Sequence, residues 1–274
     1  MKLVVGGFRG LALAFYLAAA LLPLYWIVKM AFTPTAEVLS GALRLWPSAL
    51  TLEHFQQVLN DAVFRRYFVN SVVVALSTSV LATLIASLTG AGLSRLSFRG
   101  KGLVSFVLLL TQFFPIIIVI VPLYRMLTAL HLNNNLLGLV IVYTALNIPF
   151  ATFLMKSFFD AVPRDLDEAG YIDGCTRFGA LRRIVAPLTL PGMGATLGFV
   201  FTAAWSELLF ALVLIDSESQ KTLSVGMLNF IQKGGVDWGQ ITAAATLALI
   251  PAILFFAMIQ KYLVQGLTSG SVKG

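Results

Sequence analysis

Six stretches of this chain carry almost no charge, and each has the roughly 20 residues or more that a helix needs to cross the hydrocarbon core of a bilayer. They are Leu11–Phe32, Phe68–Leu93, Leu103–Leu127, Leu136–Phe159, Gly192–Ile215 and Ile241–Tyr262. Apolar residues make up 58% of the chain, charged residues make up 11%, and the mean hydropathy is +0.90. Such a composition is too apolar for a water-soluble globule. We therefore predict an all-α membrane protein with six transmembrane helices.

Prolines lie inside these stretches at Pro23, Pro115, Pro122, Pro149 and Pro251. Neighbouring helices can satisfy the carbonyls that proline frees, so we expect kinks at these positions and no breaks. The first stretch has a second interpretation, because a basic N-terminal segment followed by an apolar run is also typical of a secretory signal. Its length favours a retained helix, since the apolar core of a signal usually spans only about 7–15 residues.

The basic residues between the stretches predict the orientation, because Lys and Arg are retained on the cytoplasmic side. With the N-terminus inside, 12 of the 19 Lys and Arg residues are cytoplasmic and 7 are outside. Both termini and residues 160–191 are then cytoplasmic, while residues 33–67 and 216–240 face outward. This bias accounts for most of the net charge of +7. No basic patch interleaved with aromatic residues indicates a nucleic-acid partner.

Other site types find little support in the sequence. The single cysteine, Cys175, excludes an internal disulfide. His54 and His131 stand far apart without companion ligands, so we expect no metal site. No repeat or low-complexity linker divides the chain, and we predict one transmembrane domain over residues 1–274.

Residues 160–191, which we call the elbow, form the only long charged segment in the second half of the chain. Asp160 is expected to cap a first helix, with Pro163 in its first turn. Gly174 is expected to end that helix, because glycine enters the left-handed conformation without a Cβ penalty. Thr176 then caps a second helix, which Pro187 terminates. An apolar face on the second helix comprises Phe178, Leu181 and Val185. From amphipathicity alone, a simple connector is an equally good interpretation.

Glu168, Ala169, Gly174, Ile184 and Pro187 stand at a characteristic spacing within the elbow. The pattern resembles the cytoplasmic coupling loop of permease subunits in binding-protein-dependent ABC importers, whose signature is Glu-Ala-Ala, three residues, Gly, nine residues, Ile-x-Leu-Pro. The chain departs from it at two places, with Gly170 in place of the second Ala and Ala186 in place of the Leu before the proline.

The resemblance covers nearly the whole chain. It is most similar to the second permease subunit of the maltose-type, carbohydrate-uptake branch, on the segments Asp173-Gly174, 204–207, 222–227 and 262–274. It implies the type I ABC importer permease fold, in the cytoplasmic (inner) membrane of a prokaryote. It also implies partners: a second homologous permease subunit, two ATP-binding cassette ATPase subunits, an extracytoplasmic solute-binding protein, and membrane lipid.

In this family the elbow docks on the ATPase and converts closure of the nucleotide domains into helix movement. The implied coupling residues are Glu168, Ala169, Gly170, Asp173, Gly174, Phe178, Ile184 and Pro187. The C-terminal tail, too polar and glycine-rich for a membrane element, is by itself expected to be disordered. The resemblance implies that it reaches the ATPase interface through Thr268, Ser269, Gly270 and Lys273.

The sequence contains no Gly-x-x-x-x-Gly-Lys-Ser/Thr phosphate loop. We therefore expect ATP and magnesium to bind to the partner ATPase, and this chain to hold no cofactor and to be a transport subunit without enzymatic activity of its own.

Glu207 is the one acid well inside a predicted span, and a carboxylate there is costly enough to face the bundle interior or a water-filled path. It could line the translocation path or anchor helices to each other, and the sequence does not choose between these roles. Trp205, Asn147 and Tyr143 are further candidates for the path, although polar contacts between helices are the commoner fate of such groups. We expect solute-binding-protein contacts at Gln232, Lys233, Gly234 and Gly235.

Two competing functions remain. An ion-coupled secondary transporter commonly shows inverted repeats and paired intramembrane charges, which this chain lacks. An ABC importer for a non-sugar solute such as glycerol phosphate would use the same scaffold. Among sugars, a maltodextrin- or trehalose-like solute is expected.

Overall fold

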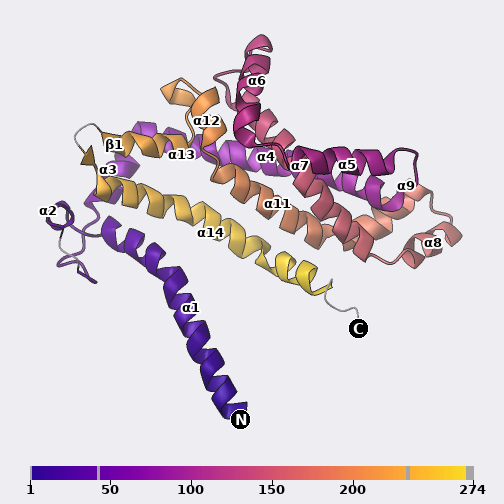
Figure 1. Cartoon of the computed structure of the whole chain (residues 1–274), viewed down its shortest axis with the longest axis horizontal. Coiled ribbons are helices and arrows are strands. Elements are labelled where there is room, and N and C mark those ends of the chain that lie inside the picture. The colour runs from indigo at the N-terminus through magenta and orange to yellow at the C-terminus, as the bar shows by residue number, and fades with distance from the viewer. Residues whose placement is uncertain (1, 42–43, 233–234, 270–274) are drawn as a thin grey trace. The chain divides into compact units, whose positions relative to one another are not determined.

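The computed structural model describes residues 2–41, 44–232 and 235–269, and most of them lie in helices. The first half comprises α1 (Lys2–Ala31), α2 (Thr35–Leu39), α3 (Glu53–Asn60), α4 (Ala62–Arg95), α5 (Lys101–Thr111), α6 (Ile116–Ala129) and α7 (Leu136–Ala161). These elements can be followed in Figure 1.

The second half begins with the elbow, which contains α8 (Asp165–Ile172), α9 (Arg177–Ala180), a π-helical turn (Leu181–Val185) and α10 (Ala186–Leu188). It continues with α11 (Leu190–Trp205), α12 (Leu209–Leu214), a 3₁₀ turn (Glu218–Gln220), α13 (Leu223–Gly226), a second 3₁₀ turn (Met227–Phe230) and α14 (Trp238–Ser269). Between them, β1 (Ile231–Gln232) pairs antiparallel with β2 (Gly235–Val236), Ile231 opposite Val236.

Length and composition allow four of the described helices to cross a membrane: Arg9–Ala31, Ala62–Arg95, Leu136–Ala161 and Trp238–Gln260. Two bent pairs raise the number to as many as six: Lys101–Thr111 with Ile116–Ala129, and Arg177–Leu188 with Leu190–Trp205. The predicted all-α membrane protein is confirmed. Four of the six predicted spans correspond to continuous helices, the third corresponds to the first bent pair, and the fifth, Gly192–Ile215, overlaps only the second helix of the other bent pair.

The third predicted span, Leu103–Leu127, is broken. α5 and α6 meet at an angle of 100° across residues 112–115, and Figure 1 shows α6 turning sharply away from α5. Pro115 immediately precedes α6 in an extended conformation. It lacks an N–H to continue the preceding helix, and it is well suited to start the next one. The expectation of no break was therefore wrong at Pro115, whereas the other four prolines do lie within continuous helices.

The fifth predicted span, Gly192–Ile215, is also divided. α11 ends at Trp205, and the short α12 begins at Leu209. The side chain of Glu207 accepts backbone N–H groups in the first turn of α12, from Phe210 (3.0 Å) and Ala211 (3.2 Å). A carboxylate at this position satisfies N–H groups that have no partner within the helix, so the break is capped from within the chain.

The backbone forms two compact units. One comprises Met1–Arg65 with Gly226–Pro251, and the other comprises Arg66–Val225 with Ala252–Gly274. The helices α4 and α14 each have residues in both units. The single transmembrane domain predicted over the chain stays a prediction.

In the smaller unit, His54 is buried and its Nε2 lies 3.0 Å from the carbonyl oxygen of Thr33. A Cβ at position 239 would come within 2.1 Å of the imidazole ring, so Gly239 is what allows α14 to pass this close. His54 therefore lies in the core of this unit, packed between α3, α14 and the turn after α1.

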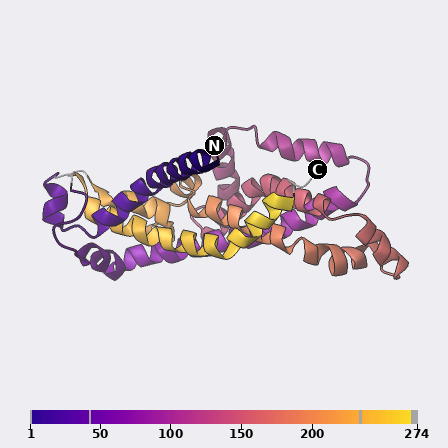
Figure 2. The same cartoon turned by 90° about the horizontal axis from the view of Figure 1, so that it is seen from below.

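In the larger unit, α4 packs along α7 through small side chains. Ala82, Ala86 and Ala91 of α4 share a buried cluster with Ala151 and Met155 of α7. A second cluster surrounds Tyr143 of α7 and contains Phe201 of α11 and Phe210 of α12. This core holds α4, α7 and α11 together, and Figures 1 and 2 both show the elbow at the end of the unit where α4 terminates.

Candidate functional site in the elbow between α7 and α11

The start of the elbow differs from the prediction at Asp160. α7 continues through Ala161, and α8 is preceded by Arg164 without a side-chain cap. Asp160 instead lies in the last turn of α7, where it accepts a hydrogen bond from Ser94 Oγ at 2.6 Å and pairs with Lys156 at 2.5 Å. The capping role assigned to Asp160 was wrong, because these tertiary and intrahelical partners hold it inside the preceding helix.

The end of α8 matches the prediction. Gly174 adopts a left-handed conformation, with φ of +83°. Its N–H bonds to the carbonyl of Tyr171 at 3.1 Å, and the N–H of Cys175 bonds to the carbonyl of Gly170 at 2.9 Å. This pair of bonds is a Schellman motif, which satisfies the last carbonyls of a helix and usually requires glycine at the left-handed position. The chain direction of the elbow is thus fixed by a local, glycine-dependent turn.

The second helix begins as predicted and ends later than predicted. The Thr176 side chain accepts the N–H of Gly179 at 3.1 Å and caps α9. Pro187 lies in the first turn of α10, where proline is tolerated, so it does not terminate the helical run. The change of direction occurs at Thr189, after which α11 leaves at 68° to the segment Arg177–Leu188.

The packing on the inner side of the elbow explains why glycine replaces the second alanine of the signature at position 170. A Cβ on Gly170 would lie 2.7 Å from Ile184 Cδ1 and 3.3 Å from Ala180 Cβ. α8 therefore packs directly against the second helix, with Gly170 and Ala180 both buried at the contact. Two residues of the signature, Gly174 and Ile184, thus fold the elbow into a closed V.

The outer side of the elbow carries both apolar and acidic groups. Ile172 is 87% exposed and Phe178 is 69% exposed. Glu168 and Asp173 are exposed as well. The predicted apolar face of the second helix is divided, because Val185 is buried while Phe178 is exposed. The elbow therefore exposes large apolar side chains as well as carboxylates, and exposed apolar groups of this size are typical of surfaces that a protein partner covers.

Sequence reasoning missed the residues that join the elbow to α4. Arg95, the last residue of α4, forms an ion pair with Asp167 of α8 at 3.2 Å, and both side chains are almost fully buried. Arg95 also donates to the carbonyl of Val162 at 2.8 Å, and Arg164 donates to the carbonyl of Ser94 at 3.2 Å. The available signals were an arginine in the last turn of an apolar helix and an aspartate among three acids on α8. The sequence does not show that these two residues pair, because they meet only in the folded chain.

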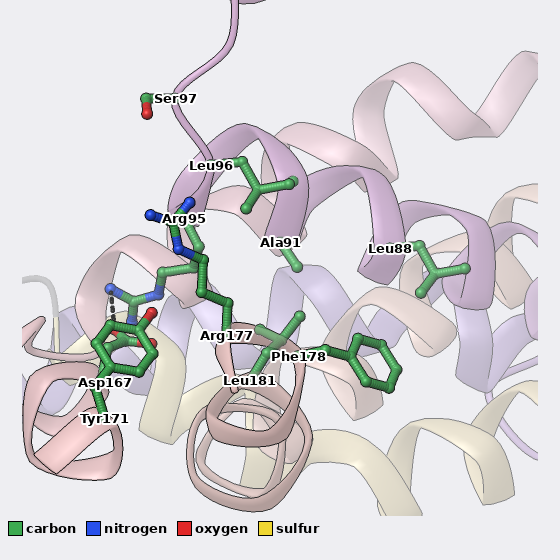
Figure 3. Close-up of a pocket in the computed structure, with 11 residues that line it drawn as sticks. Leu88, Ala91, Arg95, Leu96, Ser97, Asp167, Tyr171, Arg177, Phe178 and Leu181 are labelled. Carbon is green, nitrogen blue, oxygen red and sulfur yellow. Dashed lines mark ion pairs between the residues drawn. The ribbon is translucent and has the colours of Figure 1, made fainter. Parts of the chain in front are cut away.

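Figure 3 shows a cavity of about 440 Å³ above this ion pair. Its walls come from the end of α4, including Leu88 and Leu96, and from Tyr171, Phe178 and Leu181 of the elbow. Arg177 also lines it, so the cavity combines apolar side chains with charged ones.

The candidates for the translocation path come together around the break in the fifth span. The Tyr143 hydroxyl donates to Glu207 Oε2, and Asn147 donates to the carbonyl of Tyr143 on its own helix at 2.8 Å. Ser224 Oγ donates to the Glu207 carbonyl at 2.6 Å. Trp205 stacks on Phe201 with ring centroids 5.7 Å apart. Glu207 is therefore an anchor between α7, α12 and α13 in this structure.

The remaining predicted sites are the contacts with the solute-binding protein and with the ATPase interface. Gln232 belongs to β1 and Gly235 to β2, while Lys233 and Gly234 lie outside the described residues. Thr268 and Ser269 are the last two residues of α14, and Gly270 and Lys273 also lie outside the described residues. The expectation of a disordered tail from Gln265 was wrong through Ser269, because α14 continues to that residue.

A family model described as "Binding-protein-dependent transport system inner membrane component" matches residues 82–269, a range that contains the whole elbow. The chain belongs to this family. The resemblance drawn from the elbow signature is thereby confirmed, and the chain is a transport permease of the inner-membrane type.

The permease has full-length relatives with named cargoes. It is 34% identical over 266 residues to the sulfoquinovosyl glycerol transport system permease protein SmoH of Agrobacterium fabrum, covering 97% of this chain and 93% of the relative. It is 34% identical over 257 residues to the trehalose transport system permease protein SugB of Mycobacterium tuberculosis, covering 93% of each. It is 33% identical over 257 residues to the trehalose/maltose transport system permease protein MalG of Thermococcus litoralis, covering 93% of this chain and 92% of the relative.

Solved structures confirm the fold. A bacterial ABC transporter involved in the import of the acidic polysaccharide alginate matches with a TM-score of 0.79 at 23% identity, covering 94% of this chain and 96% of that chain. A bacterial alginate ABC transporter in complex with alginate pentasaccharide-bound periplasmic protein matches with a TM-score of 0.63 at 17% identity, covering 92% and 95%. The permease therefore has the ABC importer permease fold.

The packing of Gly170 on Ile184 predicts a coupled pair of substitutions. In a wild-type background, Ile184→Val is expected to cost about 1 kcal/mol, because it deletes a packed methyl group. In a Gly170→Ala background it should cost close to nothing, because the deleted atom is Cδ1, which lies 2.7 Å from the new Cβ. Thermal unfolding of the four variants of the assembled complex measures the difference, and an equal cost in both backgrounds would contradict this packing.

Proposed function

We propose that this permease is one transmembrane subunit of an ATP-driven importer, and that it carries a sugar or oligosaccharide of the maltodextrin or trehalose type. Its partners would be a second homologous permease subunit, two ATP-binding cassette ATPase subunits and an extracytoplasmic binding protein that delivers the solute. ATP and magnesium would be bound by the ATPase partner, since this sequence has no phosphate loop.

The single observation that carries the proposal is the outer side of the elbow. Ile172 and Phe178 expose large apolar surfaces on a rigidly closed V. Glu168 and Asp173 lie exposed on the same two-helix unit. Burying such apolar groups in a groove of the ATPase would be favourable, and the flanking carboxylates would suit a basic rim on that partner.

The elbow geometry supports a mechanical role. A movement imposed on α8 passes to the second helix through Gly170, Ala180 and Ile184, and then into α11 across Thr189. ATP binding would close the two ATPase subunits, move the elbow and open the transmembrane cavity outward, and hydrolysis would reset it. The junction between the two helices is well defined, because a Schellman turn closes the end of α8 and Thr176 caps the start of α9.

The carbohydrate cargo is supported by the relatives, whose names specify trehalose, trehalose/maltose and sulfoquinovosyl glycerol. We extend the proposal to two peripheral contacts. Gln232, Lys233, Gly234 and Gly235 would contact the binding protein on the outer side. Thr268, Ser269, Gly270 and Lys273 would reach the ATPase interface at the end of α14.

Uptake into proteoliposomes that contain the assembled complex and enclosed ATP tests the proposal. We expect labelled trehalose or a short maltodextrin to accumulate only when both ATP and the cognate binding protein are present. Accumulation of glycerol phosphate but not of sugars would overturn the cargo assignment. Accumulation that survives without ATP and disappears with an ionophore would indicate an ion-coupled transporter instead.

A further inference from the structure

One end of α4 is tied to the elbow by buried polar contacts. The Arg95 guanidinium contacts two different parts of the elbow at once, through an ion pair with the Asp167 carboxylate at 3.2 Å and a hydrogen bond to the Val162 carbonyl at 2.8 Å. Ser94, the preceding residue, donates to Asp160 Oδ1 at 2.6 Å. Breaking a buried pair from one side leaves an uncompensated charge, so this end of α4 and the elbow are expected to move together.

Near its other end, α4 is tied to a different segment. The Asn70 side-chain amide donates to the carbonyls of Ser219 and Lys221 at 3.0 and 2.9 Å. Ser71 Oγ accepts the N–H of Leu223 at 2.7 Å. Asn70 and Ser71 are both buried, and they fix the chain that leads into α13. The predicted orientation places this segment on the outer side.

Between these two ends α4 is continuous and supported. It contains no proline and runs unbroken from Ala62 to Arg95. At 1.5 Å rise per residue, Asn70 and Arg95 are separated by about 37 Å along the helix. α7 supports it closely, since a Cβ on Gly90 would lie 2.9 Å from the backbone nitrogen of Lys156, and the Thr89 and Thr152 hydroxyls lie 2.8 Å apart.

We propose that α4 is the rigid link between the elbow and the outer segment 219–223, with Arg95 and Asn70 as its positioning residues at the two ends. The inference rests on the proposed function, because it assigns the route by which solute delivery outside would reach the ATPase. A helix fastened at both ends to the two moving parts transmits displacement directly, whereas α5 and α6 are interrupted by a 100° bend and could not.

The test measures ATPase stimulation by solute-loaded binding protein in the reconstituted complex. Measured per amount of assembled complex, Arg95→Ala and Asn70→Ala are each expected to reduce this stimulation about tenfold while leaving basal hydrolysis unchanged. Sites this far apart normally act independently. If α4 links them, the double variant should lose no more than the worse single variant, and Arg95→Lys, which keeps one of the two contacts, should restore part of the stimulation.

Two matched variants control for the loss of a polar group. Ser157→Ala removes a bond from α7 to its own backbone at Leu154 (2.7 Å), and Ser79→Ala removes a bond from α4 to its own backbone at Leu76 (2.9 Å). Both should retain wild-type stimulation. Wild-type stimulation in Arg95→Ala or Asn70→Ala would overturn the link, as would losses that multiply in the double variant. A wild-type complex that shows no ATP-driven uptake would instead count against the proposed function.

Discussion

Gly174→Pro is expected to uncouple hydrolysis from transport and to reduce uptake at least about tenfold, because proline fixes φ near −65° and removes the N–H, a change that costs on the order of 3 kcal/mol in a hydrogen-bonded position. Gly174 has φ of +83° and donates to the Tyr171 carbonyl. The Schellman turn cannot survive this change, so the second helix would leave α8 in another direction. Uptake and binding-protein-stimulated ATPase of the reconstituted complex measure the effect.

Two further variants distinguish the loss of the left-handed turn from the loss of a glycine at any position. Gly174→Ala should give an intermediate loss, since a Cβ in the left-handed region costs about 1 kcal/mol. Gly102→Ala, in the first turn of α5, meets no atom within 4 Å and should behave as wild type. If Gly174→Pro retains full stimulated ATPase and uptake, the elbow is only a connector between α7 and α11.

Glu207→Ala is expected to destabilise the permease by about 2–4 kcal/mol, since it removes a helix cap and leaves a buried hydroxyl without its acceptor. Glu207 accepts from Phe210, Ala211 and the Tyr143 hydroxyl, and Tyr143 is only 2% exposed. A lower thermal midpoint of the assembled complex and less protein in the membrane are the measurable results.

A conservative variant distinguishes an anchor from a gate at Glu207. Phe210 donates to Oε1, whereas Ala211 and the Tyr143 hydroxyl donate to Oε2. Glu207→Gln retains only one of these two acceptor oxygens, so an anchor should lose part of its stability and keep normal uptake. Tyr143→Phe removes the donor, and its cost should fall in the Glu207→Ala background because the partner is already lost. Normal stability with strongly reduced uptake in Glu207→Gln would show that the carboxylate acts on the solute path.

The elbow was predictable where its structure is local. Gly174 and Thr176 act on neighbours within a few residues, and their chemistry can be read from the residue types alone. Asp160 failed for the opposite reason, since its partner Ser94 lies 66 positions earlier in the chain. The ion pair between Arg95 and Asp167, which joins the elbow to α4, could not be predicted for the same reason.

The membrane helices were predictable as apolar segments but not as unbroken rods. Hydropathy does not register the 100° bend before α6, because the residues next to Pro115 are as apolar as any in a straight helix. It also treats Ser206–Leu208 as a small dip, although the Glu207 carboxylate there caps a new helix. After Tyr262 the prediction underestimated the helix. Gln265–Ser269 looked unsuited to a helix, yet these residues continue α14.

The Schellman turn after α8 also makes the elbow directly observable. Its closing N–H belongs to Cys175, whose side chain is partly accessible and is the single thiol in the chain. A fluorophore or spin label attached to the purified subunit before assembly would therefore modify this one position without any engineered cysteine. Its signal would record when the elbow becomes covered and when it is released during a transport cycle.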